Sequence, residues 1–259
     1  MNAPLPDGVI AIARSGGVTT LTLTRPQRRN ALDLPMIRDL GAALSAAAID
    51  TDCRCVVLKG AGGSFCSGRD LGAAAELRGL APVLEYDDAY TRIFVLLAEL
   101  GKPSVAVVQG YAVAGGFTLA MGCDFVLAEA DAQFGALEMK HGFPAALNCA
   151  VLAHKTQPRN ALELLLSAGM HGAQRLYEMG LINRVAADAG ELERIEAEFV
   201  AGLVALDPLA VKLTKETLRA AASMPYAEAL TLGKQLNALL MASGHIAAAQ
   251  PAVSAVKPK

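Results

Sequence analysis

Two glycine-rich stretches of the chain could bring main-chain amides against a ligand. The first, GAGGSFCSGRDL at Gly60–Leu71, follows the apolar run Cys55–Leu58. The second, QGYAVAGGFTLA at Gln109–Ala120, follows the apolar run Ser104–Val108. Glycine lets a ligand approach the backbone closely, and a helix that starts at such a loop adds positive potential. If the two loops meet, one N–H from each could form an oxyanion hole.

These residues do not match either of two nucleotide-binding motifs, whereas a purely structural role for the glycines stays open. A Rossmann turn needs G-x-G-x-x-G, and after Gly60 and Gly62 the chain has Phe65 where the third glycine belongs. A P-loop needs Lys-Ser or Lys-Thr after its last glycine, and Gly68 is followed by Arg-Asp. For either loop alone, tight turns and close packing would explain the glycines equally well.

The elements that must position these loops alternate between strands and helices. Val9–Thr24 predicts a hairpin around Ser15-Gly16-Gly17, and Asp33 is expected to cap a helix that runs to about Ala48. Parallel strands joined by helices in right-handed crossovers are the arrangement that this alternation favours. Further strands are expected at 54–60, 104–110 and 125–130, with helices at 83–100 and 115–124.

The C-terminal half is different, because strand signals fade after about Ala145 and helical spacing takes over. We therefore predict an α/β core over residues 1–195 and a helical C-terminal region over 196–259. The tail from residue 247, rich in Ala, Pro and Lys, is expected to be loose. Helical segments are expected at 158–169, 173–181, 191–206, 208–221 and 226–242.

Composition limits the partners and the compartment. The 259 residues are 53% hydrophobic and carry a formal net charge of -2, so neither nucleic acid nor an anionic membrane is an expected partner. The five cysteines include no C-x-x-C and the four histidines have no ligand spacing, so no metal site is expected. Free buried thiols suit a reducing cytosol, and neither a signal peptide nor a membrane span is visible, which predicts a cytoplasmic protein.

Five blocks of the sequence resemble, in order, characteristic blocks of the crotonase (enoyl-CoA hydratase/isomerase) superfamily. The resemblance covers about Val9 to Ala222 and implies a spiral of ββα units with a helical C-terminal region. It further implies an acyl-CoA thioester substrate, no cofactor beyond the coenzyme A of that substrate, and a homotrimer or a dimer of trimers. The blocks are PQRRNAL, VVLKGAGGSFCSGRDL, GKPSVAVVQGYAVAGGFTLAMGCD, AQFGALE and AQRLYEMGLINRV.

The resemblance assigns catalytic roles to four positions. It implies that the backbone N–H groups of Arg69 and Gly115 form the oxyanion hole, with Ala114 as a mild departure from a glycine. Family hydratases carry two glutamates, and here Thr118 stands at the first position and Glu138 at the second. Thr118 cannot act as a carboxylate base, although its hydroxyl could orient water.

A single carboxylate is enough to move a proton between two carbons, whereas hydration also requires water to be activated. His141 and Asn148, close to Glu138 in sequence, are candidates to supply the missing group. The segment HGFPAALNC departs from the glycine-rich pattern of the family, so the acyl group stays open. The residues expected to bind substrate are Arg29, Ser67, Gly68, Asp70 and His141.

Some of these binding residues have plain alternatives. Arg29 resembles a CoA phosphate contact, but an ordinary surface arginine is an equal reading. Asp70 suits the cap of the next helix better than chemistry.

The leading hypothesis is an enzyme that forms an enolate from an enoyl-CoA and either hydrates it or shifts its double bond. Thioester hydrolysis or decarboxylation on the same scaffold is an alternative. A catalytically silent acyl-CoA-binding subunit is another, which Thr118 favours and Glu138 with both donor loops opposes.

Overall fold

The computed structural model describes residues 9–76 and 78–245. The chain divides between Val204 and Ala205 into two compact units. The boundary expected after residue 195 falls inside helix α8 (Ala189–Val204), whose buried side chains Leu192 and Val200 pack on the sheet of the first unit. The loose tail expected from residue 247 lies outside the described residues.

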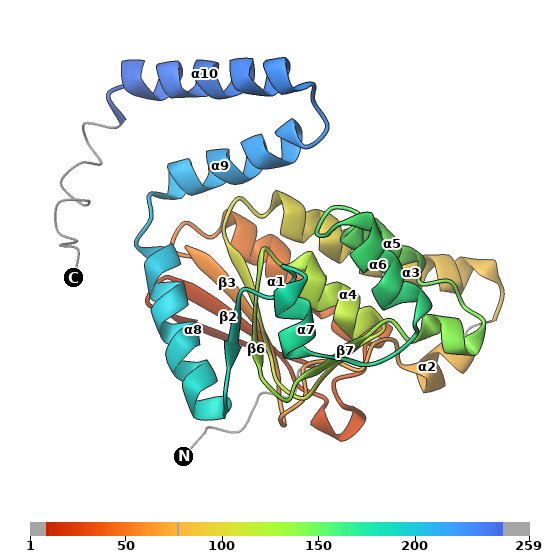
Figure 1. The fold of residues 1–259 in the computed structure, drawn as a ribbon. Coiled ribbons are helices and arrows are strands. Elements are labelled where there is room, and N and C mark those ends of the chain that lie inside the picture. Colours follow the sequence, from red (N-terminus) through yellow and green to blue (C-terminus); the bar gives the residue numbers. More distant parts are fainter. Residues whose placement is uncertain (1–8, 77, 246–259) are drawn as a thin grey trace. The chain divides into compact units, whose positions relative to one another are not determined.

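The first unit is built on a six-stranded sheet with the order β1-β2-β3-β4-β6-β9 (Figure 1). The hairpin β1–β2 is antiparallel, as the sequence predicted, and every other pairing in this sheet is parallel. Gly16 and Gly17 close the hairpin with φ of +55° and +81°, the backbone that a two-residue turn of this type requires. The strands are Ile10–Ser15, Val18–Leu23, Cys55–Gly60, Ser104–Val108, Phe125–Glu129 and Arg184–Ala186.

A second, three-stranded sheet joins β5 (Tyr111–Val113), β7 (Gln133–Gly135) and β8 (His171–Gly172). The expectation that strands end near Ala145 is therefore wrong, because β8 and β9 both follow that point. Two or three residues are too few to display the alternation of a strand, so these segments gave no period-two signal.

The central strands β3, β4 and β6 are buried on both faces, as is typical of parallel strands, whereas the edge strand β1 is largely exposed. Leu21, Leu58, Ala106 and Val126 form one row of paired residues across four strands, and all belong to the larger apolar cluster. The alternate positions of the same strands face α8 and form a smaller cluster with it (Figure 1). That cluster contains Cys55, Val57, Val105, Val107, Leu127, Ala186, Leu192 and Val200.

The cap that the sequence predicted for the first helix is present. Asp33 Oδ1 accepts the N–H of Met36 at 3.0 Å, which confirms the predicted cap of α1 (Leu34–Ile49). The remaining α-helices are α2 (Leu71–Glu76), α3 (Leu80–Glu99), α4 (Gly115–Gly122), α5 (Ala146–Leu152), α6 (Pro158–Leu166) and α7 (Ala173–Glu178), and the short 3-10 helices are η1 (Pro26–Arg28) and η2 (Glu138–His141).

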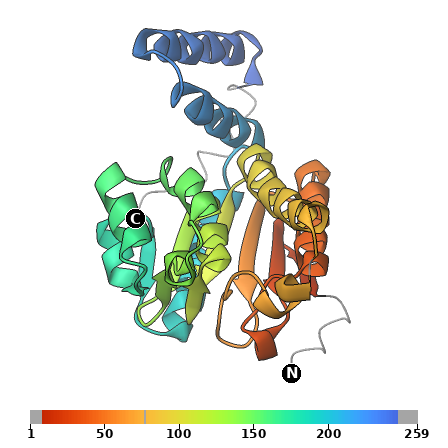
Figure 2. The same ribbon diagram turned by 90° about the vertical axis from the view of Figure 1, so that its right-hand side faces the viewer.

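The second unit is a pair of helices, α9 (Pro208–Ala221) and α10 (Tyr226–Ala242), which pack on each other (Figure 2). Asp207 caps α9 by accepting the N–H of Ala210 at 2.8 Å. Its Oδ1 also lies 3.0 Å from Nε2 of His245, which follows α10. The Asp207 carboxylate therefore links the start of α9 to the residue that follows the end of α10. In the part of the chain that the structure describes, no helix is both long and apolar enough to span a bilayer.

Candidate active site

The two glycine loops meet in the first unit. Cys66 in the first loop donates its N–H to the carbonyl of Tyr111 in the second at 2.8 Å. A methyl group on Gly68 would lie 2.9 Å from the nitrogen of Gly115, and one on Gly115 would lie 3.6 Å from the nitrogen of Arg69. The two amides that the sequence singled out are therefore neighbours in space, although they lie in separate loops.

The direction of the two N–H groups follows from the bonds around them. Leu32 donates to the carbonyl of Gly68 at 2.7 Å and accepts from the N–H of Asp70 at 2.8 Å. In this parallel bridge the N–H of Arg69 is turned away from Leu32. Gly115 is the first residue of α4, so its N–H is one of the free donors at a helix start. Neither amide is a donor in the loop hydrogen bonds of residues 9–76 and 78–245.

The backbone before α4 leaves little room for side chains. Ala114 has φ +49° and ψ −121°, a conformation that glycine favours and other residues adopt at a cost. Its N–H is anchored to the carbonyl of Gly135 at 2.7 Å. A methyl group on Gly116 would lie 2.1 Å from the carbonyl oxygen of Cys66, closer than any real contact. The alanine in place of a glycine is thus a strained residue of the donor loop, not a neutral change.

Three side chains from three elements form a hydrogen-bonded chain beside these loops. Thr118 of α4 places Oγ1 2.8 Å from Oδ1 of Asn148 on α5. Asn148 donates from Nδ2 to Oε1 of Glu138 on η2 at 2.9 Å. Thr118 and Asn148 are both buried. Thr118 therefore contacts Asn148 instead of standing free to orient water, and Asn148 contacts Glu138 instead of replacing it.

Burial governs the ionisation of Glu138. Its Oε2 is buried and has no hydrogen-bond partner among the described residues. Loss of hydration raises the pKa of Glu138 above its usual range, while its own backbone N–H and the Asn148 amide oppose that shift only in part. The hydroxyl of Tyr90 from α3 donates to the carbonyl of Gly115, and burial keeps the pKa of Tyr90 well above its ordinary value. Tyr90 is therefore a neutral neighbour of an acid that is poised to exchange a proton.

Asp70 supports the loop structurally. Its Oδ1 accepts the N–H groups of Gly72 and Ala73 at 3.1 and 3.3 Å, which caps α2, and its Oδ2 pairs with Arg25 at 2.9 Å. Burial alone would raise the pKa of Asp70, but the hydrogen bonds from Arg25 and Ala73 and the charge of Arg25 together hold it below its usual value. These contacts occupy both carboxylate oxygens, so they favour the capping interpretation over substrate binding.

Of the other residues expected to bind substrate, Arg29 and Gly68 lie beside the two amide donors, whereas His141 lies on the short helix η2. Arg29 is exposed, and its carbonyl accepts the N–H of Ser67 at 3.0 Å, so the arginine stands directly beside the first loop. Its guanidinium lies 5.4 Å from the centre of the Tyr111 ring. Gly68 adjoins Gly115, as described above. His141 is exposed at the end of η2 and does not join the Thr118–Asn148–Glu138 chain.

The side chains of Arg69 and Cys66, both in the first loop, have structural roles. The guanidinium of Arg69 lies 3.8 Å from the centre of the Tyr86 ring and 3.3 Å from Oδ1 of Asp87, both on α3. Its side chain therefore holds the loop against α3, while its backbone N–H is turned away from Leu32. Burial raises the pKa of Cys66 to about 12, so this thiol is inert at neutral pH.

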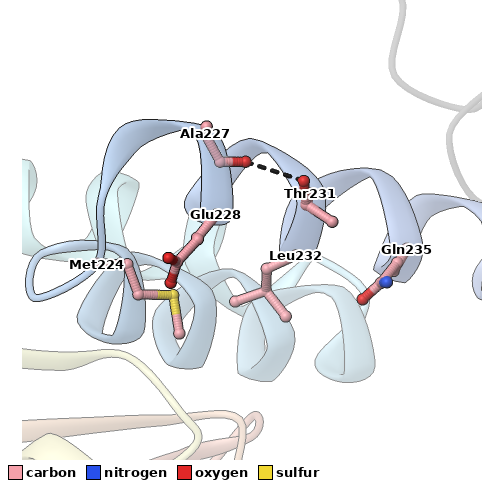
Figure 3. A pocket seen from close by; sticks show the side chains of 6 residues that line it. All are labelled: Met224, Ala227, Glu228, Thr231, Leu232 and Gln235. Atoms are coloured by element: carbon pink, nitrogen blue, oxygen red, sulfur yellow. Dashed lines mark hydrogen bonds between the residues drawn. The ribbon is translucent and has the colours of Figure 1, made fainter.

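The second unit has a hollow of about 320 Å³ along α10 (Figure 3). Glu228 is the single titratable group among its lining residues, and Thr231 uses its hydroxyl to bond the Ala227 carbonyl at 2.9 Å. This lining has no pair of groups suited to proton transfer. The lining residues are Met224, Ala227, Glu228, Thr231, Leu232 and Gln235.

Sequence reasoning missed several residues that shape the site. Asn148 was a candidate only because it lies near Glu138 in sequence, and Tyr90, Arg25 and Asn30 were not singled out. Their contacts join segments far apart in the chain, so residue spacing carries no signal for them. The one available hint was the density of hydrogen-bonding side chains in the connector RPQRRNALD.

Comparison with known proteins gives matches over nearly all of the chain. The model of the enoyl-CoA hydratase/isomerase family matches residues 13–250. A putative enoyl-CoA hydratase of Thermus thermophilus is 35% identical over 234 residues, or 89% of this chain and 92% of that protein. A carnitinyl-CoA dehydratase of Escherichia coli is 33% identical over 220 residues, or 84% and 83%. The crystal structure of an enoyl-CoA hydratase of Mycobacterium smegmatis matches with a TM-score of 0.88 and 27% identity over 98% of this chain and 99% of that one.

The matched region contains both donor loops, Thr118 and Glu138. The fold shared with the solved enoyl-CoA hydratase confirms the crotonase fold that the five sequence blocks predicted. The chain therefore belongs to the enoyl-CoA hydratase/isomerase family and is an enzyme of that class.

Proposed function

We propose that the enzyme shifts the double bond of an enoyl-CoA thioester, with Glu138 as the only proton carrier. The N–H groups of Arg69 and Gly115 bind the thioester oxygen, which becomes negatively charged when the substrate forms an enolate. Arg29, Ser67 and Gly68, which adjoin these donors, bind the CoA part of the substrate. The single observation that carries the proposal is the pairing of a half-buried carboxylate at Glu138 with a buried hydroxyl at Thr118.

A single carboxylate can remove and return the one proton that this reaction moves. Glu138 removes a proton from C2 of a 3-enoyl thioester, and the C–H electron pair forms a C1=C2 bond while the carbonyl pair moves onto oxygen. When the carbonyl re-forms, the double bond moves to C2–C3, and C4 takes the proton back from Glu138. The carboxylate is regenerated and the substrate is neither oxidised nor reduced. The reaction therefore requires neither a redox cofactor nor a metal.

Hydration of a 2-enoyl-CoA is the second candidate, and the names of the relatives favour it. Both the Thermus thermophilus protein and the Mycobacterium smegmatis structure carry the name enoyl-CoA hydratase. In this chain Glu138 would then have to activate water and also serve the α-carbon, because the Thr118 hydroxyl is already engaged with Asn148. That double demand makes isomerisation the better fit to the site.

The decisive experiment follows a panel of 2-enoyl-CoA and 3-enoyl-CoA substrates in the parent enzyme and in Glu138→Gln. Conjugation of the double bond raises the absorbance of the thioester, and hydration lowers it, so one assay separates the two reactions. We expect isomerisation in the parent and a loss of about 10²- to 10⁴-fold in turnover in Glu138→Gln, because glutamine cannot accept the proton.

Glu163→Gln, which changes an exposed carboxylate paired with Arg175, is the matched control and is expected to keep full turnover. Full turnover in Glu138→Gln contradicts the mechanism. A parent enzyme that binds acyl-CoA without turning over any substrate would instead identify a silent binding subunit, and release of free CoA would identify a hydrolase.

The remaining parts of the proposal are tested with the same assay and one measurement of mass. Turnover is expected to be unchanged by EDTA, because the proton transfer uses only residues of this chain and its substrate. The assembly is expected to be a homotrimer or a dimer of trimers, which light scattering on the purified protein measures. Loss of turnover in EDTA, restored by one metal, would overturn the first expectation.

A further inference from the structure

The Thr118–Asn148–Glu138 chain gives the site a feature that a lone carboxylate lacks. We propose that Asn148 is a positioning residue that fixes the Glu138 carboxylate, and that the hydrogen bond from Thr118 holds the Asn148 amide in place. The inference rests on the proposed function in one respect, that Glu138 carries the proton. Its evidence is the geometry of three side chains from η2, α4 and α5.

The polarity of the chain follows from what each group can donate. The Asn148 Nδ2 lies 2.9 Å from Oε1 of Glu138, a contact that only the NH₂ side of the amide can make with a carboxylate. The other side of the amide, Oδ1, then needs a donor, and the hydroxyl of Thr118 lies 2.8 Å away. With the amide reversed, Oδ1 would face the carboxylate and two acceptors would repel each other. The Glu138 carboxylate therefore fixes the orientation of the amide, and the Thr118 hydroxyl, which also has the carbonyl of Ala114 as an acceptor at 3.2 Å, holds the Oδ1 side of it in place.

The fixed carboxylate leaves one oxygen for chemistry. Asn148 occupies Oε1, while Oε2 is buried and has no hydrogen-bond partner among the described residues. An unsatisfied buried acceptor costs about 1–3 kcal/mol, so a folded protein rarely keeps one without a use. Removal of a proton from a substrate carbon is such a use, since it requires a carboxylate oxygen with a free lone pair.

Burial makes this pair hard to replace by solvent. Thr118 and Asn148 are each 1% exposed, so water cannot take over either bond without an opening of the packing between α4 and α5. The titratable group that faces Glu138 from another element is Tyr90 on α3, and Lys140 and His141 share the short helix η2 with it. Among residues 9–76 and 78–245, the Asn148 amide is the side chain that favours the ionised form of Glu138, and it opposes the rise in pKa that burial causes.

The test compares Asn148→Ala, Thr118→Val and Thr118→Ser by two readouts. The first is the titration of the Glu138 carboxyl carbon by NMR, assigned with Glu138→Gln, which does not depend on turnover. The second is the pH dependence of kcat, whose acid limb reports the same group because the base must be ionised. In Asn148→Ala both are expected to move to higher pH, since only the backbone N–H of Glu138 then opposes the effect of burial. We expect kcat to fall about 10- to 100-fold and KM to stay within about 3-fold.

Thr118→Val keeps the shape but removes the donor, so it is expected to shift the Glu138 titration in the same direction by a smaller amount. Thr118→Ser keeps the hydroxyl and is expected to restore the Glu138 titration to that of the parent. The double variant is expected to resemble Asn148→Ala alone, because Thr118 acts through Asn148.

An unchanged Glu138 titration in Asn148→Ala overturns the proposal, as do additive effects in the double variant or equal behaviour of the two Thr118 variants. If the titration shifts as expected but the parent turns over no enoyl-CoA, the positioning role stands and the proposed function fails. If Asn148→Ala does not fold, the comparison of Thr118→Val with Thr118→Ser decides the question.

Discussion

The two loops that supply the proposed oxyanion donors are held in place by different means. Residues 60–70 carry Arg69 and are called the Arg69 loop, and residues 109–118 are called the Gly115 loop. Main-chain hydrogen bonds join the two loops, but the first also depends on side-chain hydrogen bonds and ion pairs from the connector before α1, whereas close main-chain packing dominates in the second. The two donors of the proposed oxyanion hole should therefore be displaced by different perturbations.

Side chains from the connector before α1 hold the Arg69 loop. Asn30, fully buried and with φ +55°, donates from Nδ2 to the carbonyl of Ser64 at 2.7 Å. Arg25 reaches Asp70 at the end of the loop at 2.9 Å and Asp33 at the start of α1 at 3.0 Å. The position of the Arg69 N–H thus depends on a guanidinium shared between two carboxylates.

Close backbone packing holds the Gly115 loop. A methyl group on Gly116 would lie 2.1 Å from the carbonyl oxygen of Cys66, and one on Gly110 would lie 2.3 Å from another carbonyl oxygen of the Arg69 loop. Ala114 is bonded to Gly135 through its N–H at 2.7 Å. Added volume should damage this loop, while changes of pH or salt should leave it intact.

Gly116→Ala should give the largest effect. The new methyl group would meet a backbone carbonyl that cannot move without shifting the Arg69 loop, so both donors are displaced together. We expect a loss of about 3 kcal/mol or more in the free energy of unfolding, with turnover reduced by about 10²-fold or more. Urea unfolding and the enoyl-CoA assay measure the two quantities.

Gly202→Ala is the matched control for this change. Gly202 lies in α8, and a methyl group there would have no neighbour within 4 Å. Because alanine is the better helix former, the control is expected to gain about 0.5–1 kcal/mol. A Gly116→Ala protein as stable as the parent would show that the two loops are not in the contact described.

Arg25→Met should give the next largest effect, and it acts on the other loop. Methionine fills the volume but leaves Asp70, which is 8% exposed, without its cationic partner. Breaking such a pair is costly because the remaining charge stays desolvated, and we expect a loss of about 2 kcal/mol. Arg38→Met removes an exposed partner of Glu85 and should change stability by less than about 0.5 kcal/mol.

The pH dependence of the Arg25 effect carries a definite sign. The folded protein holds the pKa of Asp70 below its usual value, so this contribution is present above the unfolded pKa and is lost as pH falls through the folded one. The stability difference between parent and Arg25→Met should therefore shrink as the pH is lowered from neutrality to about 3. A difference that stays constant over this range would contradict the assigned role of the pair.

The same contrast explains which parts of the fold the sequence could predict. The hairpin, the Asp33 cap and the buried strands are encoded by neighbouring residues, and they form where expected. The strands β5, β7, β8 and β9 are too short for alternation to be visible, and they form through main-chain pairing: β9 with the longer β6, and β5, β7 and β8 with one another.

The candidate site likewise contains residues that the sequence could predict and residues that it could not. The ordered sequence blocks pointed to Arg69, Gly115 and Glu138, because each of these residues belongs to a local motif. The contacts that hold them do not, since Thr118 and Asn148 are 30 residues apart and Arg25 and Asp70 are 45 apart. A side chain that acts on a distant partner leaves no periodic signal, so these supporting residues emerge only from the fold.

Ala114→Gly should give the smallest effect, and it should be stabilising. At φ +49° and ψ −121° the alanine is strained by about 1–3 kcal/mol, which glycine relieves. Glycine also makes the unfolded chain more flexible, which costs about 0.4–1 kcal/mol, so a net gain of about 1 kcal/mol is expected. Turnover should stay within about 2-fold, because the N–H of Gly115 keeps its place at the start of α4.

Ala168→Gly, at φ +45° beyond α6, is the control that relieves strain away from the donors. If Ala114→Gly lowers turnover strongly while Ala168→Gly does not, the strain itself positions the Gly115 donor, and the Gly115 loop is held by more than volume.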